Sequence, residues 1–434
     1  MARRPQRKAK PPSAVPVELT VTEIGARGDG LADHGGRRVY VPLTVAGDRV
    51  RVRVDEPRGD GVAARLLDLL EPGPERAEPP CPHFGVCGGC TLQHLNDLAY
   101  ADWKRAQVVT ALARAGLTGI DVAPIVRTPA ASRRRATFAA TRRGGRVTLG
   151  FNERQSHRIA DISGCLVVKR EILALLAPLE SLLAVILPDG AALDVTVTAL
   201  ETGLDVLLTG GAEPGLDARE RLAAFAQTSD IARLSRRRSP TSPPEPVAAR
   251  RPVYIRFGGV PVPIGSGAFL QASAEGEAAL VDAVLAGVGD ARKIADLFAG
   301  LGTFTFPLAM SAAVHAVEGD APAMSTLSAA ARSSANVTTE RRDLFDNPLT
   351  VSELSRFDAV VFDPPRAGAR EQSNLIAVSG VPTVVAVSCN PATFARDARI
   401  LTDGGYHLER VTPVDQFVWS AHVELVARFT LASR

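Results

Sequence analysis

The chain has 434 residues, of which 46% are hydrophobic and 22% charged, and its net charge is +3. This composition is ordinary for a globular protein and excludes a largely disordered chain. No apolar run reaches the roughly 20 residues of a bilayer-spanning helix, so we expect no membrane association. At about 150 residues per domain, the length predicts about three domains.

The first part of the chain divides into a tail and a small barrel. Residues 1–15 are basic with no apolar stretch behind them, which predicts a disordered tail and no signal peptide. Residues 16–72 alternate β-branched segments (VELTVTEI, RRVYVP, DRVRVRVDEP and VAARLLDLL) with glycine-rich turns. Short strands at this spacing predict a five-stranded barrel of the OB type, a fold that often binds single-stranded nucleic acid.

Residues 73–262 mix helical and strand patterns, which predicts a central α+β domain. Helices are expected at residues 96–115 and over EILALLAPLESLLAVIL. Two hairpins are expected, one turning at Gly144-Gly145 and one formed by ALDVTVTAL and GLDVLLTGG. The segment SPTSPPEP at residues 239–246 has little to bury and is predicted to be a mobile loop.

Arginine is concentrated in this central region. Residues 132–158 contain eight arginines and one acid, Glu153, and the predicted hairpin carries some of these arginines at its tip. A second group is Arg233, Arg236, Arg237 and Arg238. Such density favours contact with RNA or DNA through bidentate phosphate binding. A GC-rich genome is the alternative explanation, because arginine outnumbers lysine 45 to 5 in the total of 50.

From residue 263 to 434, strands and helices alternate. The strand segments are KIADLF, AVHAVEG, AVVFDPP, TVVAVSCN, HLERVTPVDQF and VELVARFTL. This rhythm predicts a doubly wound, mostly parallel sheet with its ligand at the carboxyl edge of the strands. The last two strands follow each other closely, so we expect them to be antiparallel.

Four strand ends carry candidate site residues. The turn DLFAGLG lets backbone approach a ligand, and Glu318 ends the next strand, where a carboxylate can accept from ribose hydroxyls. The third glycine of a dinucleotide fingerprint is missing, which favours an adenosine ligand without phosphates, such as S-adenosylmethionine. Asp363 and Cys389 end the next two strands, and a nearby helix N-terminus is expected to lower the pKa of Cys389.

The other four cysteines suggest a metal site. Five cysteines, three of them close together, argue against a secreted disulfide framework and favour the cytoplasm. By spacing alone, zinc and an iron–sulfur cluster are equally suitable. The candidate ligands are Cys81, Cys87, Cys90 and Cys165, with His83 or His94 as alternative fourth ligands.

Five segments in this order, CPHFGVCGGCTLQH, DLFAGLGTFTFPLA, VFDPPRAG, SCNPATFARD and WSAHVELV, resemble the RNA 5-methyluridine methyltransferase family. The predicted barrel resembles a TRAM domain, an RNA-binding module, so the resemblance spans residues 16–434. It implies a multidomain α/β protein with a Rossmann-like, seven-stranded methyltransferase sheet. It also implies methyl transfer from S-adenosylmethionine to uridine C5 in RNA, with ribosomal RNA favoured over transfer RNA, by a cytoplasmic monomer.

The resemblance also assigns roles to residues. Cys389 would add to uridine C6 as the nucleophile, and Glu424 would remove the C5 proton. The implied cofactor contacts are Gln271, Phe298, Thr303, Glu318, Asp343 and Asp363, and the implied ligands of a [4Fe–4S] cluster are Cys81, Cys87, Cys90 and Cys165.

Some positions depart from the family pattern. Ser273 and Thr303 each replace a common asparagine, and Val418-Trp419 replaces a Pro-His pair. These departures motivate one alternative, an RNA-binding iron–sulfur protein with an inactive methyltransferase domain. Methylation of a small molecule or a protein is a third possibility, which the barrel and the arginine-rich hairpin disfavour.

Overall fold

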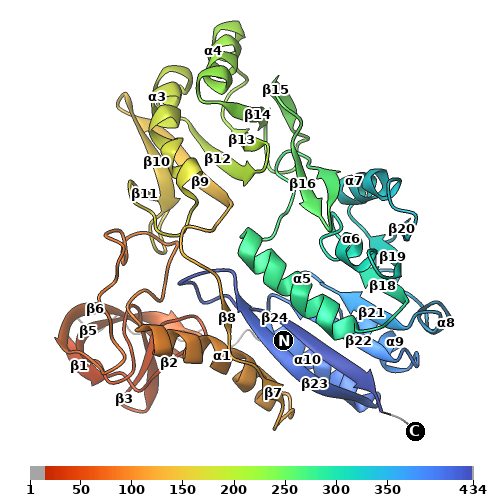
Figure 1. Ribbon diagram of the computed structural model, residues 1–434. Helices are drawn as coiled ribbons and strands as arrows, with labels where there is room; N and C mark the ends of the chain where they lie inside the picture. The colour runs from red at the N-terminus through yellow and green to blue at the C-terminus, as the bar shows by residue number, and fades with distance from the viewer. Residues whose placement is uncertain (1–14, 433–434) are drawn as a thin grey trace, which may run out of the picture. The chain divides into compact units, whose positions relative to one another are not determined.

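The computed structural model describes residues 15–432 (Figure 1). The predicted disordered tail, apart from Val15, lies outside the described residues. The chain forms two compact units, Met1–Trp103 with Trp419–Ala421, and Lys104–Val418 with His422–Arg434. Within residues 15–432, no helix has the length and apolar character needed to cross a bilayer.

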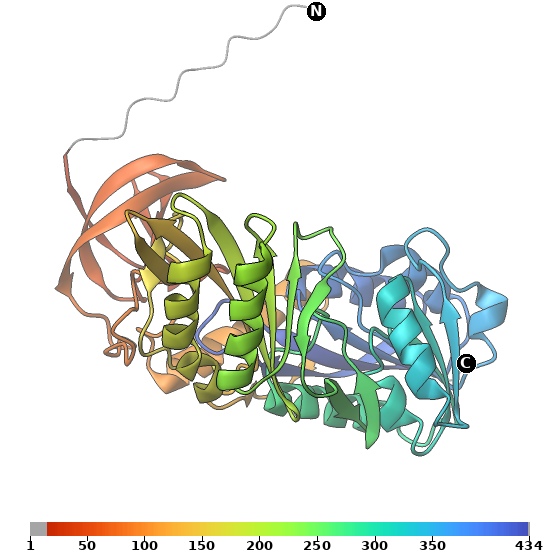
Figure 2. The same cartoon turned by 90° about the horizontal axis from the view of Figure 1, so that it is seen from above.

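The first unit contains a curled six-stranded sheet (Figure 2). Its spatial order is β1 (Val17–Thr20), β5 (Arg49–Arg58), β6 (Gly61–Glu71), β4 (Arg37–Val41), β3 (Gly30–His34) and β2 (Glu23–Ile24). The sheet therefore has six strands where five were predicted. VELTVTEI splits into β1 and β2 because Val21 leaves the ladder to hydrogen-bond Asp48 and Gly47. β3 was missed because the sequence GLADH lacks β-branched residues.

The helix expected at residues 96–115 is α1 (Asp97–Arg114). The Asn96 side-chain oxygen accepts from the Ala99 backbone N–H at 2.9 Å, which satisfies one of the free donors at the helix start. The prediction is confirmed to within one residue at each end.

The second unit begins with a seven-stranded sheet. Its spatial order is β11 (Ile159–Asp161), β10 (Arg146–Asn152), β9 (Arg135–Arg143), β12 (Ala192–Leu200), β13 (Gly203–Gly210), β14 (Ile231–Arg237) and β15 (Glu245–Ala249). Both predicted hairpins are present, β9–β10 and β12–β13. Gly144 and Gly145 have φ values of 58° and 79°, the left-handed conformation that a tight two-residue turn requires.

Two predictions in this region need correction. The single helix expected over EILALLAPLESLLAVIL is α2 (Arg170–Ala174) and α3 (Leu176–Ile186), because Pro178 cannot donate to the preceding turn and clashes with it. The loop expected at residues 239–246 ends in β15, where Pro246 pairs with Ser235. β15 is an edge strand, and an edge tolerates a residue that has no N–H.

Helices α3 and α4 (Leu216–Thr228) lie on the same side of this sheet (Figure 2). Buried side chains such as Phe138, Leu149 and Val195 form the sheet's contribution to this core. A short hairpin of β16 (Tyr254–Phe257) and β17 (Val260–Pro263) then leads into the last part of the chain.

The last part of the chain builds a largely parallel sheet of nine strands. Its spatial order is β20 (Val337–Arg341), β19 (Ala313–Glu318), β18 (Lys293–Leu297), β21 (Ala359–Phe362), β22 (Thr383–Ser388), β24 (Glu424–Leu431), β23 (Tyr406–Asp415) and β7 (Asp121–Val122), with β8 (Val126–Arg127) also paired to β23. Seven strands come from residues 293–431. The remaining two are the short β7 and β8, which the sequence pattern did not suggest.

The strand directions agree with the predicted winding. β24 runs antiparallel to both β22 and β23, as expected for the last pair. β20 was missed because VTTER is partly exposed and not apolar. The helices of this part are α5 (Ala274–Val288), α6 (Thr305–Leu308), α7 (Ala321–Ala331), α8 (Val351–Leu354), α9 (Arg370–Ala377) and α10 (Pro391–Asp403).

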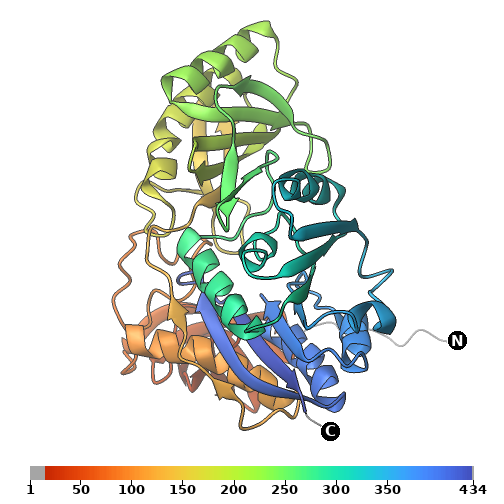
Figure 3. The ribbon, with the colours of Figure 1, turned by 45° about the vertical axis from the view of Figure 1, so that its right-hand side comes forward.

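Two apolar cores cover the two faces of this sheet. One core joins α5 and α6 to alternate strand residues such as Val361 and Val385, and α5 runs along β22 and β24 (Figure 3). The other joins α1 and α8–α10 to the intervening residues, such as Val360 and Val384. Burial on both faces explains the near-continuous apolar strands and leaves the carboxyl edge for polar side chains.

Candidate active site

Cys389 and Glu424 meet at the carboxyl edge of the sheet. Ser388, the last residue of β22, pairs with Leu425 of the antiparallel β24. Cys389 follows Ser388 and Glu424 precedes Leu425, so the two residues are the next positions of the same ladder. The Cys389 side chain is half-buried, and Glu424 is buried, with 6% of its surface exposed. The pairing register therefore brings together a thiol and a carboxyl group that are 35 positions apart in the sequence.

The turn after β21 is tied to the turn after β22. The Asn390 side-chain amide donates to the Arg366 carbonyl at 3.0 Å, and the Thr393 hydroxyl donates to the same carbonyl at 3.2 Å. Asp363 begins the turn that contains Arg366, on the strand next to Cys389. The predicted residues Asp363, Cys389 and Glu424 thus share one edge of the sheet.

Burial and mutual repulsion raise the pKa values of these groups. Burial raises the pKa of Glu424 to about 7. Burial and the charge of Glu424 raise the pKa of Asp363 to about 8. Burial, and then Glu424 and Asp363, raise the pKa of Cys389 to about 11, although Arg366 opposes this. The net shift is therefore upward, opposite to the lowering that a helix N-terminus can produce, because burial and two carboxyl groups raise the pKa of Cys389.

Gln416 connects the predicted base to a predicted cofactor residue. Its amide nitrogen donates to the Gln271 side-chain oxygen at 2.7 Å, and its oxygen accepts from the Ala272 N–H at 3.0 Å. A hydrogen bond with Gln416 also favours the ionised form of Glu424. Gln271 and Gln416 are both buried. Sequence reasoning missed Gln416, whose only signal was an amide at the end of an apolar strand.

Lys104 holds the segment that precedes Glu424. Its ammonium group is fully buried and lies 2.9 Å from the buried carboxylate of Asp415. It also donates to the backbone carbonyls of Phe417 and His422. Burial lowers the pKa of Lys104, and the charge of Asp415 opposes that shift. The Lys104 ammonium group therefore holds both ends of the loop between β23 and β24 in place.

The predicted adenosine end of the site lies after β18 and β19. Both carboxylate oxygens of Glu318 accept backbone N–H groups, from Gly300 at 2.8 Å and from Asp320 at 2.7 Å. Phe298 has a φ of 61°, and its ring centroid lies 5.5 Å from that of Phe345. These contacts hold the Glu318 carboxylate and an aromatic pair at the same edge, a suitable setting for a ribose and a planar base.

The other predicted contacts differ in what the structure gives them. Asp343 is exposed, and its carboxylate accepts from the Phe345 N–H at 2.9 Å. Thr303 lies half-buried in the glycine turn after β18. Ser273, one of the departures from the family pattern, caps α5 by accepting from the Gly276 N–H at 3.0 Å. That departure therefore has a structural role.

Asp296 is a candidate that sequence reasoning did not single out. It is fully buried, and one carboxylate oxygen accepts from the Thr305 hydroxyl at 2.5 Å. The other oxygen has no hydrogen-bond partner among residues 15–432. Burial is the main reason why the pKa of Asp296 rises to about 7. The available signal was an acid in the middle of the apolar strand KIADLF.

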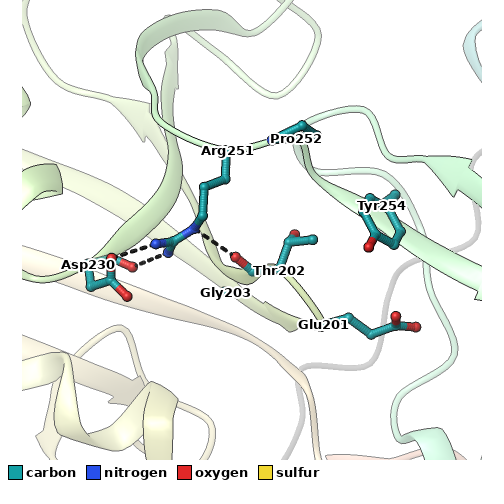
Figure 4. Close-up of a pocket in the computed structure, with 7 residues that line it drawn as sticks. All are labelled: Glu201, Thr202, Gly203, Asp230, Arg251, Pro252 and Tyr254. Atoms are coloured by element: carbon teal, nitrogen blue, oxygen red, sulfur yellow. Dashed lines mark hydrogen bonds and ion pairs between the residues drawn. The ribbon is translucent and has the colours of Figure 1, made fainter.

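A surface pocket elsewhere in the second unit contains none of the predicted site residues (Figure 4). Its lining is Glu201, Thr202, Gly203, Asp230, Arg251, Pro252 and Tyr254. The Arg251 guanidinium already binds the Asp230 carboxylate at 2.6 Å and the Thr202 carbonyl at 3.0 Å. Because these groups already bind each other, we place the candidate active site at the sheet edge and not in this pocket.

Comparison with known proteins bears on this geometry. Residues 264–428 match the family model described as tRNA (Uracil-5-)-methyltransferase. An uncharacterised RNA methyltransferase of Brucella melitensis is 47% identical over 95% of this chain and 97% of its own length. A 23S rRNA (uracil(1939)-C(5))-methyltransferase of Alkalilimnicola ehrlichii is 33% identical over 95% of this chain and 96% of its own. The chain belongs to the RNA uracil-C5 methyltransferase family.

A solved structure agrees with this fold. The Pyrococcus abyssi tRNA (uracil-54, C5)-methyltransferase, determined with S-adenosyl-L-homocysteine, has a TM-score of 0.75 and 22% identity, covering 95% of this chain and 100% of its own. The predicted family is confirmed, and with it an enzyme of the RNA uracil-C5 methyltransferase class.

The four predicted metal ligands were not found as a cluster. Cys81, Cys87 and Cys90 belong to the first unit and Cys165 to the second. All four lie outside disulfides, and backbone N–H groups approach the sulfurs of Cys87 and Cys165 at 3.4 Å. Such N–H contacts suit thiolate ligands. Nevertheless, residues 15–432 contain no group of three or more His, Cys, Asp or Glu side chains arranged to hold a metal ion.

Proposed function

We propose that this enzyme transfers a methyl group from S-adenosylmethionine to C5 of a uridine in ribosomal RNA, through a covalent bond between Cys389 and uridine C6. The observation that carries the proposal is the ladder register that sets Cys389 opposite Glu424, with Asp363 at the same edge. A nucleophile and a base close together at one edge are what this reaction needs.

Each proposed step follows from these groups. The Cys389 thiol first loses its proton to solvent, a step that the nearby Arg366 charge favours, and the thiolate adds to C6, which makes C5 nucleophilic as an enolate forms. S-adenosylmethionine, when bound, supplies the electrophilic methyl group, so that a C5–methyl bond forms as the sulfur–methyl bond breaks. Glu424 then takes the C5 proton, and elimination breaks the C6–sulfur bond and restores the thiolate. The pKa of Glu424, raised by burial to about 7, suits a base that works near neutral pH.

The residues at the other end of the edge suit the methyl donor. Glu318 is held for the ribose hydroxyls, the Phe298 and Phe345 rings are available to an adenine, and the turn after β18 is glycine-rich. Gln271 would face the donor from the α5 side, with Asp363 between the donor and Glu424. Phe269, two positions before Gln271, is 71% exposed and offers a ring on which a flipped base can stack.

The preference for ribosomal RNA rests on relatives. The Alkalilimnicola ehrlichii protein named for 23S rRNA matches 95% of this chain and 96% of its own length. We expect 5-methyluridine to be missing from one position of 23S rRNA when the gene is deleted. Sequencing of modified positions in ribosomal and transfer RNA from the deletion strain would measure this. Loss confined to transfer RNA would contradict the assignment.

We further propose a [4Fe–4S] cluster at Cys81, Cys87, Cys90 and Cys165, as a structural element that takes no part in methyl transfer. Four thiols outside disulfides suit this ligand set. Protein purified without oxygen should be brown and contain about four iron atoms per chain, and Cys87→Ser should lose most of the iron. The matched control is Cys389→Ser, which should retain it. A colourless protein with one zinc would instead favour a site that includes His83, whose Nε2 is buried with no partner among the described residues.

A further inference from the structure

The seven-stranded sheet of the second unit has a polar face opposite the one that carries α3 and α4. Cross-strand contacts identify its members: Thr137 with Thr196 at 2.9 Å, Asp205 with Arg233 at 2.7 Å, and Thr209 with Arg237 at 3.0 Å. Arg135 pairs in register with Thr198, which pairs with Asp205. Since side chains alternate between the two faces of a strand, these residues share one face, which we call the polar face.

The arginines on the two faces are neutralised differently. On the helix side, Arg236 pairs with Glu213, and on the polar face Arg233 binds both carboxylate oxygens of Asp205. Arg135 and Arg237 have no carboxylate within 4.0 Å among residues 15–432. The guanidinium of Arg135 donates to the Gly267 carbonyl, and that of Arg237 to the Thr209 hydroxyl and the Pro240 carbonyl.

Arg135 and Arg237 are close enough for their charges to repel each other. Burial lowers the pKa of Arg135, and the charges of Arg133 and Arg237 lower it further, while the charge of Asp205 opposes the shift. Its Nε is also buried without a hydrogen-bond partner among the described residues. A group of half-buried cations is unfavourable unless an anion completes it. The arrangement therefore suits a ligand with several negative charges.

The cations continue from this face to the nucleophile. The Arg133 guanidinium lies over the Phe417 ring at 5.6 Å, and that ring lies 5.7 Å from the His422 ring. The Nδ1 atom of His422 is 3.1 Å from the Arg366 guanidinium, whose charge acts on Cys389. All of these residues belong to the second unit.

We propose that Arg237, Arg135, Arg133 and Arg366 form a phosphate track that guides the backbone of single-stranded RNA to Cys389. This inference rests on the proposed function for its ligand. RNA is favoured because guanidinium groups bind phosphates in a bidentate manner, and because only an unstacked nucleotide can bring uridine C6 to a thiol at a sheet edge. Contacts to the RNA backbone give affinity that does not depend on the base sequence. The track would therefore bind any single-stranded RNA that contains a uridine.

The test measures RNA binding separately from methyl transfer. The probe is a fluorescent, unstructured RNA of about 30 nucleotides, longer than one binding site, titrated at several KCl concentrations. The double variant Arg135→Gln/Arg237→Gln should bind at least about tenfold more weakly, and the slope of log K against log salt should fall by about 1.4, since each lost phosphate contact removes about 0.7. Affinity for S-adenosylmethionine, measured by calorimetry, should stay unchanged.

Two further variants make the result specific. Arg219→Gln/Arg221→Gln removes two exposed arginines that pair with Glu213 and Asp217 around α4, on the helix side of the same sheet, and should leave the slope unchanged. Arg135→Lys/Arg237→Lys retains the charges and should recover most of the slope, which separates loss of charge from misfolding.

A wild-type slope in Arg135→Gln/Arg237→Gln would overturn the track. The same holds if the α4 variant lowers the slope equally. Failure of the proposed function would look different: wild-type protein would bind the probe with the expected slope and transfer no methyl group to RNA.

Discussion

Cys389→Ala should reduce methyl transfer to RNA by about 10⁴-fold or more, the scale of loss when a covalent nucleophile is removed. Without the thiol, nothing adds to uridine C6, and C5 stays too weakly nucleophilic to take the methyl group. The measurement is transfer of radiolabelled methyl from S-adenosylmethionine to ribosomal RNA from a deletion strain. Cys389 is half-buried, so its replacement by alanine should leave the fold intact.

Glu424→Gln is the matched variant, because it should stop the same cycle at a later step. Its amide cannot accept the C5 proton, so a methylated protein–RNA adduct should accumulate and survive a denaturing gel. The double variant Cys389→Ala/Glu424→Gln should form no adduct. Methyl transfer that persists in Cys389→Ala would refute the covalent mechanism, and so would an adduct in the double variant.

The second large effect concerns Lys104, which we expect to govern the stability of the second unit. Lys104→Met leaves the buried Asp415 carboxylate without its cation and removes donors from the carbonyls of Phe417 and His422. Breaking one partner of a buried ion pair costs about 3–5 kcal/mol. Urea denaturation followed by circular dichroism should show the loss in the free energy of unfolding.

Two comparisons isolate the buried charge as the cause. Lys104→Met/Asp415→Asn removes both charges and should regain much of the stability, because no uncompensated charge stays buried. Lys169→Met removes a partly exposed lysine, 3.7 Å from Glu171, and should change stability by less than about 1 kcal/mol. Equal losses in Lys104→Met and in Lys169→Met would contradict the role of Lys104.

Lys104 and Gln416 together explain how Glu424 is held. Lys104 fixes Asp415, Gln416 is the next residue, and its side chain bonds both Gln271 and Glu424. Buried polar networks of this kind hold one geometry because each unsatisfied member would be costly. The position of Glu424, the proposed base, is thus coupled to Gln271, a proposed cofactor contact.

The sequence by itself determined the family and most strands and helices of the second unit, and it predicted the candidate site residues. Asp363 and Cys389 were found because each ends an apolar strand, and parallel strands bring their carboxyl ends to one edge. Gly144-Gly145 marked a hairpin for an equally local reason, since both residues need a positive φ. These signals were readable because they depend on a few neighbouring residues.

Only the tertiary structure decided which strand residues pair, how the pKa values at the site are shifted, and which arginines lie beside an acid. That Ser388 pairs with Leu425 is a matter of register, which no local pattern states. The raised pKa of Cys389 depends on burial and on two carboxyl groups from other strands, and it reversed the expectation from helix α10. Acids from distant segments likewise determined which arginines are neutralised. Electrostatic energies depend on distances across the fold, so residue types in a sequence cannot supply them.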